Sequence, residues 1–366
     1  MDKKKTTIVF VLASIDAPHI LKRIGEFIDR GYNVEVYGFK HFRETSLVLP
    51  DSFNINIVGE ITQENYWKRI STLIRGVKYV IAKCKGEKVI YYLPSLDVAI
   101  FHLLFCKSPY IYEESDLKHT YVKSRFTQSI LEFISKKIIK NAEVAAFTSE
   151  GFRKFHFGDN APLNTCLVPN KLNASIRNLP QIVKNNIDLN HIRFAFVGKA
   201  QFASVYKFAE EIAKYYPQHE MHFYGTVDDR DIEVIDRLKK HSNIYFHGRF
   251  SNPKDLPSIY SCIDILLAIF DLKPSNWLYA EPNKLYDSIY FRTPIIAPKG
   301  TYLEDRVNEM GIGYSIDMLN ESVKDFISSL SIESLNHKIS NLNNIPLSYA
   351  VNDNHVLFEM IDNIKR

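Results

Sequence analysis

The segment AEPNKLYDSIYF gathers polar residues whose types and spacing suit the binding of a phosphate ester. A helix is predicted from about 282 to 291, because Pro282 suits a first turn, where its missing N–H costs no hydrogen bond. The free N–H groups of Asn283 and Lys284 would lie at the positive end of this helix, and Lys284 adds a mobile cation. Asp287, one turn later on the same side, could accept hydrogen bonds from a ribose. The segment predicts a nucleotide-diphosphate site; a helix start with a Lys–Asp surface pair is the simpler interpretation.

The elements that must position this segment are short apolar runs that alternate with helical patterns. Strands are predicted at IRFAFVG (192–198), EMHFYG (220–225), NIYFHG (243–248) and IDILLAI (263–269), and the apolar PIIAP follows the segment. Strands that alternate with helices favour a parallel sheet covered on both faces, and ligands bind at the carboxyl ends of its strands. Because the segment follows 263–269, we expect it at that carboxyl edge.

The N-terminal half of the chain shows the same alternation. Its strands are predicted at 6–14, 33–39, 88–93, 110–115 and 143–149. A polar, aperiodic stretch from 175 to 190 reads as a linker. The predicted fold is α/β, with two Rossmann-like doubly wound parallel-sheet domains that face each other across a cleft. We expect an N-terminal domain over 1–175, a nucleotide-binding domain over 190–345, and a C-terminal helix within 346–366 that could pack back on the first domain.

The composition narrows the class of protein. The net charge of +4 is too small to indicate nucleic-acid binding by itself. The four cysteines are far apart, without CxxC or metal-ligand spacing, so they are expected to be reduced thiols of a cytoplasmic protein. No apolar stretch approaches the roughly 20 residues of a membrane span. These features predict a cytoplasmic protein, with the inner face of the membrane as a further expected location.

The membrane contact depends on RFTQSILEFISKKIIK, a predicted amphipathic helix within 125–142. Its basic residues Arg125, Lys136, Lys137 and Lys140 lie on one side, and its apolar residues Phe126, Ile130, Phe133 and Ile134 lie on another. Such a helix can rest on anionic lipid and bring the protein to a lipid-linked acceptor. The alternative, which we favour because the sheet must be covered, is a helix that packs its apolar side on the sheet and leaves a solvated basic face.

Several motifs of other enzyme classes are missing. The sequence has no G-x-x-x-x-G-K-[ST], no G-x-G-x-x-G after a strand and no G-x-S-x-G, which disfavours ATP hydrolysis, hydride transfer and serine chemistry. The one G-x-G, at 311–313, is expected to be a turn. DDRD (228–231) has the acid-x-acid spacing of a metal-dependent transferase, but an aspartate that opens a helix at 231 explains it more simply. No metal site is predicted.

Several segments of the chain resemble those of a known family. The order NIYFHGRF, LPSIYSCIDILLAIF and EPNKLYDSIYFRTPIIAP is similar to the nucleotide-binding domain of family 4 glycosyltransferases, which have the GT-B fold. VPN at 168–170, VGKAQFASVYKFAEEI, IYEESDLKHTY and FTSEGFRKF also resemble segments of this family. The resemblance implies transfer of a sugar from a nucleotide-diphosphate donor to a glycan or lipid-linked acceptor. It further implies retention at the anomeric carbon, no bound metal, no cofactor besides the donor, and a place in surface polysaccharide biosynthesis.

The family pattern maps onto individual positions. Its donor-site signature is two glutamates separated by seven residues; Asp287 matches the second, whereas the first falls on Tyr279. Glu281 lies two residues nearer and is the candidate substitute. Lys199, after VG, matches the lysine that holds the diphosphate; a solvated loop cation is the alternative. Asp116 matches the acid of the first domain that orients hydroxyl groups, with helix capping as the alternative.

Three functions remain open from the sequence. The first is a glycosyltransferase, the second a sugar-nucleotide epimerase with the same two-domain architecture, and the third a non-catalytic nucleotide-sugar-binding scaffold that lost the first acid. The candidate catalytic residues are Asp116, Glu281 and Lys284, and the candidate donor-binding residues are Lys199, Pro282, Asn283, Lys284 and Asp287.

Overall fold

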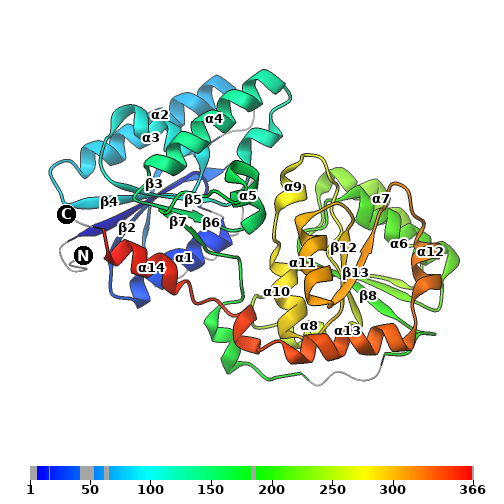
Figure 1. Ribbon diagram of the computed structural model, residues 1–366. Helices are drawn as coiled ribbons and strands as arrows, with labels where there is room; N and C mark the ends of the chain where they lie inside the picture. Colours follow the sequence, from blue (N-terminus) through cyan, green and yellow to red (C-terminus); the bar gives the residue numbers. More distant parts are fainter. Residues whose placement is uncertain (1–5, 16, 42–52, 62–65, 183–186, 365–366) are drawn as a thin grey trace. The chain divides into compact units, whose positions relative to one another are not determined.

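The computed structural model describes residues 6–15, 17–41, 53–61, 66–182 and 187–364 (Figure 1). The chain forms two compact units, Met1–Pro169 with Asn354–Arg366, and Asn170–Asp353. The first boundary therefore lies earlier than the predicted residue 175, because Leu172 pairs with Val351 and is buried in the core of the second unit. Part of the predicted linker, 183–186, lies outside the described residues, and the expected cleft stays a prediction.

The first unit contains a seven-stranded parallel sheet in the order β3-β2-β1-β4-β5-β6-β7. Its strands are β1 (Thr7–Leu12), β2 (Asn33–His41), β3 (Ile55–Ile61), β4 (Val89–Leu93), β5 (Tyr110–Glu114), β6 (Val144–Phe147) and β7 (Thr165–Leu167). β1, β4, β5 and β6 are almost wholly buried, as expected for parallel strands with helices on both faces.

Two helical layers cover this sheet. The helices are α1 (Pro18–Asp29), α2 (Tyr66–Lys83), α3 (Leu96–Phe105), α4 (Arg125–Asn141), α5 (Glu150–Phe157) and α14 (His355–Asp362), with a short 3₁₀ turn η1 (Lys118–Tyr121). Figure 1 shows α2, α3 and α4 along one face of the sheet, with α1 and α14 on the other. Leu357, Phe358 and Ile361 of α14 are buried in the same core as Phe27 of α1. The end of the chain thus packs on the first unit.

The second unit contains a six-stranded parallel sheet in the order β10-β9-β8-β11-β12-β13. Its strands are β8 (Arg193–Val197), β9 (Glu220–Tyr224), β10 (Ile244–Gly248), β11 (Ile265–Leu267), β12 (Ile295–Pro298) and β13 (Gly313–Ile316). The helices are α6 (Ala203–Tyr215), α7 (Ile232–Leu238), α8 (Leu256–Ser261), α9 (Asn276–Tyr279), α10 (Asn283–Tyr290), α11 (Tyr302–Met310), α12 (Val323–Ser329) and α13 (Ile332–Asn344), with 3₁₀ turns η2 (Ala174–Asn178), η3 (Asp229–Asp231) and η4 (Leu347–Ala350).

The structure shows the conformation of the G-x-G and DDRD segments. Gly311 ends α11 in the left-handed conformation, at φ 62°, and Gly313 begins β13, so the G-x-G is a helix end followed by a strand. Within DDRD, the Asp228 side chain accepts a hydrogen bond from the Arg230 N–H and opens η3. Asp231 stands at the cap position of α7, as predicted, although its side chain makes no cap hydrogen bond.

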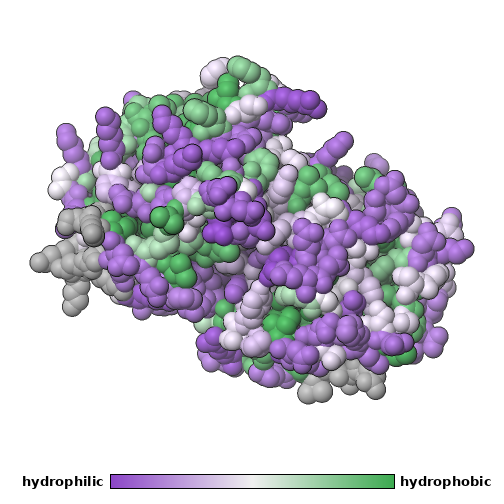
Figure 2. All heavy atoms as spheres, viewed as in Figure 1, coloured by the Kyte–Doolittle hydropathy of each residue, from purple (hydrophilic) through white to green (hydrophobic). Residues whose placement is uncertain are grey.

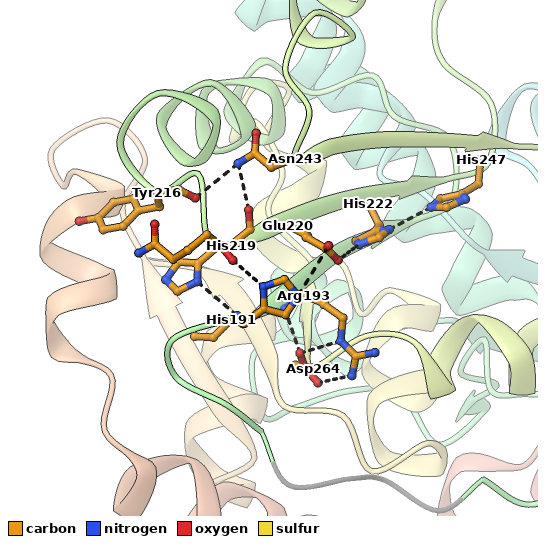
Figure 3. Close-up of polar contacts among 11 residues, drawn as sticks. His191, Arg193, Tyr216, His219, Glu220, His222, Asn243, His247 and Asp264 are labelled. Carbon is orange, nitrogen blue, oxygen red and sulfur yellow. Dashed lines mark hydrogen bonds and ion pairs between the residues drawn. The ribbon is translucent and has the colours of Figure 1, made fainter.

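A polar network fixes the amino ends of β8, β9 and β11 (Figure 3). The guanidinium of Arg193 donates two hydrogen bonds to Asp264, with N–O distances of 3.0 and 2.8 Å, which ties β8 to the entry of β11. The Glu220 carboxylate contacts His222 at 3.0 Å and His191 at 3.6 Å. His222 is a strand residue, as predicted. Within the described ranges no three His, Cys, Asp or Glu side chains are placed to hold a metal ion.

The strand order of each sheet reverses at one point, between β1 and β4 in the first unit and between β8 and β11 in the second. In open α/β sheets, ligands bind at the carboxyl ends of strands next to such a reversal. Each unit therefore has one edge where a site is expected. No helix among the described residues is long and apolar enough to cross a membrane.

Candidate functional site

The amino end of α10 has the geometry of an anion site. Pro282 is the cap residue, with φ −78° and ψ 156°, and its side chain makes no hydrogen bond to the first N–H groups. The helix is one residue shorter at each end than the predicted 282–291, so Pro282 precedes the first turn instead of lying in it. Asn283, the first helical residue, is exposed. The N–H groups of this turn carry the positive end of the helix dipole.

Lys284 places a cation next to this helix end. Its Nζ lies 4.2 Å from the centre of the Phe196 ring and 5.6 Å from that of Phe270. A Cβ atom added to Gly198 would lie 3.4 Å from the same Nζ. Because Phe196 and Gly198 are at the carboxyl end of β8 and Phe270 follows β11, the ammonium lies at the reversal of strand order. The structure thus brings Lys284 to the place where an anionic ligand is expected.

The aromatic surroundings of Lys284 change its protonation. Burial lowers the pKa of Lys284 to about 8, and the Asp287 carboxylate, one turn along α10, opposes this shift. A lysine that is desolvated in this way binds an incoming anion without giving up a large hydration shell. Below about pH 8 the group is charged, so it can attract a diphosphate under ordinary cellular conditions.

The nearby helix α6 does not offer a comparable amino end. The Asp271 carboxylate accepts hydrogen bonds from the N–H groups of Ala203 and Ser204, both at 2.9 Å, and from the Ser204 hydroxyl. A carboxylate of the chain itself therefore occupies the place that a phosphate would take at α6. At α10, by contrast, the cap residue Pro282 supplies no such hydrogen bond.

Lys199 lies on the same edge but has an acidic partner. Its Nζ is 3.0 Å from the Asp228 carboxylate, which also accepts a hydrogen bond of 2.8 Å from the Arg230 guanidinium. These contacts hold the pKa of Asp228 well below its usual range. Lys199 is about half exposed and would have to leave Asp228, or share it, to hold a diphosphate. Its predicted role stays a prediction.

The two acids near α10 have partners inside the second unit. Asp287 is buried and accepts a hydrogen bond of 3.0 Å from the Tyr260 hydroxyl. Glu281 is also buried; it accepts a hydrogen bond from the Tyr286 hydroxyl and lies 3.5 Å from the Arg306 guanidinium. The predicted contact of Asp287 with a ribose, and the predicted role of Glu281 as substitute for the first acid, would use carboxylate oxygens in addition to these bonds. Both roles stay predictions.

Glycines at three neighbouring strand ends form a feature that the sequence analysis missed. FVG, FYG and FHG end β8, β9 and β10, and their glycines Gly198, Gly225 and Gly248 have φ of 130°, 125° and 75°. A Cβ at Gly225 would lie 2.2 Å from the Gly198 carbonyl oxygen, so the backbones of these loops approach too closely for a side chain. The signal was the F-x-G pattern, repeated at the end of three predicted strands.

The first unit has a polar pocket at its own reversal point. A cavity of about 280 Å³ lies at the carboxyl ends of β1, β4 and β5. It is lined by polar side chains that include Ser14, His19, Ser95, Ser115, Asp116 and Lys118. The Asp116 carboxylate is 3.4 Å from the Lys118 ammonium and is partly exposed. Burial lowers the pKa of His19, against the opposing effect of the Glu113 and Asp116 carboxylates.

A buried ion pair lies beside this pocket and includes Glu113, one of its lining residues. Glu113 is fully buried and accepts hydrogen bonds from Arg23 Nε and the Ser115 hydroxyl, both at 3.2 Å, and from the Tyr92 hydroxyl. Arg23 also donates to Glu26 at 2.8 Å. Glu113 therefore fixes Ser115, and with it the start of the loop that carries Asp116. Sequence alone does not show that an arginine from α1 reaches Glu113.

Comparison with known proteins identifies the fold of this chain. No family model and no curated protein matches this chain. Among solved structures, Anabaena HepE in complex with UDP and glucose is 12% identical with a TM-score of 0.68, covering 97% of this chain and 99% of that one. WaaG, a glycosyltransferase involved in lipopolysaccharide biosynthesis, is 14% identical with a TM-score of 0.63, covering 94% and 97%. The chain has the GT-B fold.

The GT-B fold alone leaves the reaction open. A putative UDP-N-acetylglucosamine 2-epimerase from Listeria monocytogenes is 9% identical with a TM-score of 0.61, covering 97% of this chain and 95% of that chain. Transferases and epimerases thus both resemble this GT-B chain at low identity. The choice between them depends on the site.

The pKa of Lys284 gives a test of the predicted diphosphate site at α10. The affinity for a nucleotide sugar is expected to fall about tenfold between pH 7 and pH 9, because the Lys284 ammonium with its pKa of about 8 loses its proton over this interval. Isothermal titration calorimetry at several pH values measures this change. In Lys284→Arg the guanidinium stays charged, so its affinity is expected to be flat. Equal pH profiles in the two proteins would contradict the assignment.

Proposed function

We propose that this protein is a glycosyltransferase that moves a sugar from a nucleoside-diphosphate donor to an acceptor hydroxyl. One observation carries the proposal: the uncapped amino end of α10 and the Lys284 ammonium meet at the reversal point of the second sheet. A helix amino end with an adjacent cation binds a diphosphate, the common part of all such donors. The crystal structures of HepE with UDP, whose fold this chain shares, support the same choice.

The chemistry of this site is electrostatic. The α10 N–H groups and Lys284 would stabilise the negative charge that develops on the departing diphosphate. Transfer with retention, which the family resemblance implies, lets the leaving phosphate take the acceptor proton, so no enzymic nucleophile is needed. This agrees with the partners of Asp287 and Glu281, both of which are already hydrogen-bonded to buried tyrosines.

The acceptor is proposed to bind in the polar pocket of the first unit. Asp116 and His19 line this pocket beside Lys118, and carboxylate and imidazole groups are suited to orient a sugar hydroxyl. We propose a glycan or lipid-linked acceptor, in the biosynthesis of a surface polysaccharide, by analogy with the fold relative in lipopolysaccharide biosynthesis. The protein would act in the cytoplasm, and contact with the inner face of the membrane is part of this proposal.

Two other functions have specific support. The fold relative described as a putative epimerase favours a sugar-nucleotide epimerase, which needs no acceptor. A binding scaffold is favoured by Tyr279, which stands where the family has its first donor-site acid. Glu281, the candidate substitute, is engaged with Tyr286 and Arg306.

Product analysis separates these functions. Thermal-shift measurements with UDP, GDP and ADP identify the nucleotide, and the corresponding nucleotide sugars are then incubated with and without a panel of glycan and lipid-linked acceptors. A transferase is expected to extend an acceptor, an epimerase to convert the donor alone, and a scaffold to bind without turnover. The same assays with and without EDTA test the independence from metal that the resemblance implies. Turnover of the donor in the absence of acceptor, giving an epimer, would overturn the proposal.

A further inference from the structure

Helix α4 exposes a stripe of apolar side chains. Phe126, Ile130 and Phe133 follow one another at helical spacing and are 77%, 42% and 70% exposed. The stripe continues through Lys137 to Lys140, both of which are also exposed. An isolated exposed apolar residue needs no explanation, but two phenylalanines and an isoleucine in one line, ending in lysines, form a surface.

This stripe is not the side of α4 that covers the sheet. Ser135, Ile138 and Ile139 are the buried residues of the helix, and they face the first unit's core. The sequence analysis favoured an apolar side packed on the sheet, with Phe126, Ile130 and Phe133 on that side. The structure corrects this: the helix covers the sheet mainly through other residues, and of the predicted apolar side Phe126, Ile130 and Phe133 are exposed while Ile134 is half-buried.

The neighbouring helices extend the same surface. Leu104 and Phe105 at the end of α3 are exposed, and the Lys78 ammonium of α2 lies 4.3 Å from the centre of the Phe105 ring. α2, α3 and α4 form one layer on the sheet (Figure 1). Figure 2 shows hydrophobic side chains among hydrophilic ones over α2 and α4. The outer face of this layer thus mixes aromatic and basic side chains.

The charge of this layer differs from that of the rest of the chain. Residues 66–85 contain six Lys or Arg and no acid, and residues 117–141 contain six Lys or Arg and one Glu, so these segments carry +6 and +5. The whole chain carries +4, which leaves −7 on all other residues. Positive charge is therefore concentrated on the helices that expose the aromatic side chains.

We propose that the outer face of α2, α3 and α4 docks on an anionic lipid bilayer. The basic residues would lie among the phosphate head groups, and Phe126, Ile130 and Phe133 would enter the interface, the arrangement of a helix that lies in the membrane plane. A second copy of the chain fits this face less well, because it would bring two strongly cationic layers together.

This contact gives the proposed acceptor site a lipid partner. α4 follows η1, whose first residue, Lys118, lines the pocket with Asp116. Phe126 therefore begins the stripe at the end of α4 that is nearer to the pocket. The suggestion that the acceptor is lipid-linked rests on the proposed function. The membrane contact itself does not, because vesicle binding can be measured without sugar transfer.

Co-sedimentation of the full chain with vesicles tests this proposal. The wild-type protein is expected to bind vesicles of phosphatidylcholine with about 30% phosphatidylglycerol at least about tenfold more strongly than phosphatidylcholine alone. Phe126→Ser/Phe133→Ser and Arg125→Ala/Lys137→Ala/Lys140→Ala are each expected to reduce binding to the anionic vesicles about tenfold or more. The matched controls Tyr215→Ser/Ile232→Ser and Lys240→Ala/Lys254→Ala/Lys324→Ala change exposed residues of the second unit and are expected to bind like the wild type.

Each other outcome contradicts the proposal. Equal binding to both kinds of vesicle, or equal losses in test and control variants, would show that the layer is not a specific anionic-lipid surface. Absence of vesicle binding by the folded wild-type chain would do the same, whether or not the protein transfers sugar. If light scattering shows a dimer that Phe126→Ser/Phe133→Ser dissociates, the surface binds a second copy instead of lipid.

Discussion

Lys284→Ala is expected to weaken binding of a nucleoside diphosphate by about 30- to 150-fold at pH 7, because a charge-assisted hydrogen bond to phosphate contributes about 2–3 kcal/mol. The Lys284 ammonium lies at the reversal point against Phe196 and Phe270. Turnover of a nucleotide sugar should fall at least as much, since the charge on the diphosphate grows as the bond to the sugar breaks.

The controls for this prediction separate Lys284 from other cations. Lys199→Ala is expected to cost only a few-fold, because the Lys199 ammonium is paired with Asp228 at 3.0 Å. Lys240→Ala, which changes an exposed residue just after α7, should have no effect on binding. Calorimetry with the same nucleotide on all three variants gives the comparison. A larger loss for Lys199→Ala than for Lys284→Ala would move the diphosphate to the β8 loop and away from α10.

Glu113→Ala is expected to destabilise the first unit by about 3–5 kcal/mol, because it leaves the Arg23 guanidinium buried without its main partner. Burial alone would lower the pKa of Arg23, but the Glu113 carboxylate raises it above its usual range. The same change frees Ser115, which Glu113 holds, so the loop with Asp116 should lose its position as well. Thermal unfolding followed by circular dichroism should show that the midpoint temperature of the first unit's unfolding is lowered by roughly 10 °C.

A matched ion pair on the same unit provides the comparison. Glu132 is paired with Lys136 on α4 at 2.7 Å, but both side chains are about one-third exposed. Glu132→Ala is therefore expected to change stability by less than about 1 kcal/mol. The double variant Arg23→Met/Glu113→Leu should be more stable than Glu113→Ala, because it removes both buried charges. Equal stability of Glu113→Ala and Glu132→Ala would show that Glu113 does not hold the pocket together.

The fold was largely predictable because its strands are continuous apolar runs. Parallel strands covered on both faces, such as β4 and β5, are buried throughout and are easily recognised. β3 was missed because it lies at the sheet edge and six of its seven residues are half-buried or exposed, without a continuous apolar run. The helix α2 that follows it was missed together with it.

The site was only partly predictable because its partners are distant in sequence. The α10 segment could be recognised from Pro282 and its neighbours, and its helix was predicted to within one residue. Local sequence does not show that Asp271 caps α6, that Lys284 reaches Phe196 or that Tyr260 holds Asp287, since these contacts join residues 27 or more positions apart. The F-x-G repeats were visible, but only the structure shows that Gly225 lets its loop approach the loop of Gly198.

The most direct measurement is a crystal structure of the full chain with UDP, or with whichever nucleoside diphosphate gives the largest thermal shift. We expect the diphosphate oxygens within hydrogen-bond distance of the Asn283 and Lys284 N–H groups and of the Lys284 ammonium. Diphosphate density at the amino end of another helix, with the first turn of α10 in contact with solvent alone, would contradict the account.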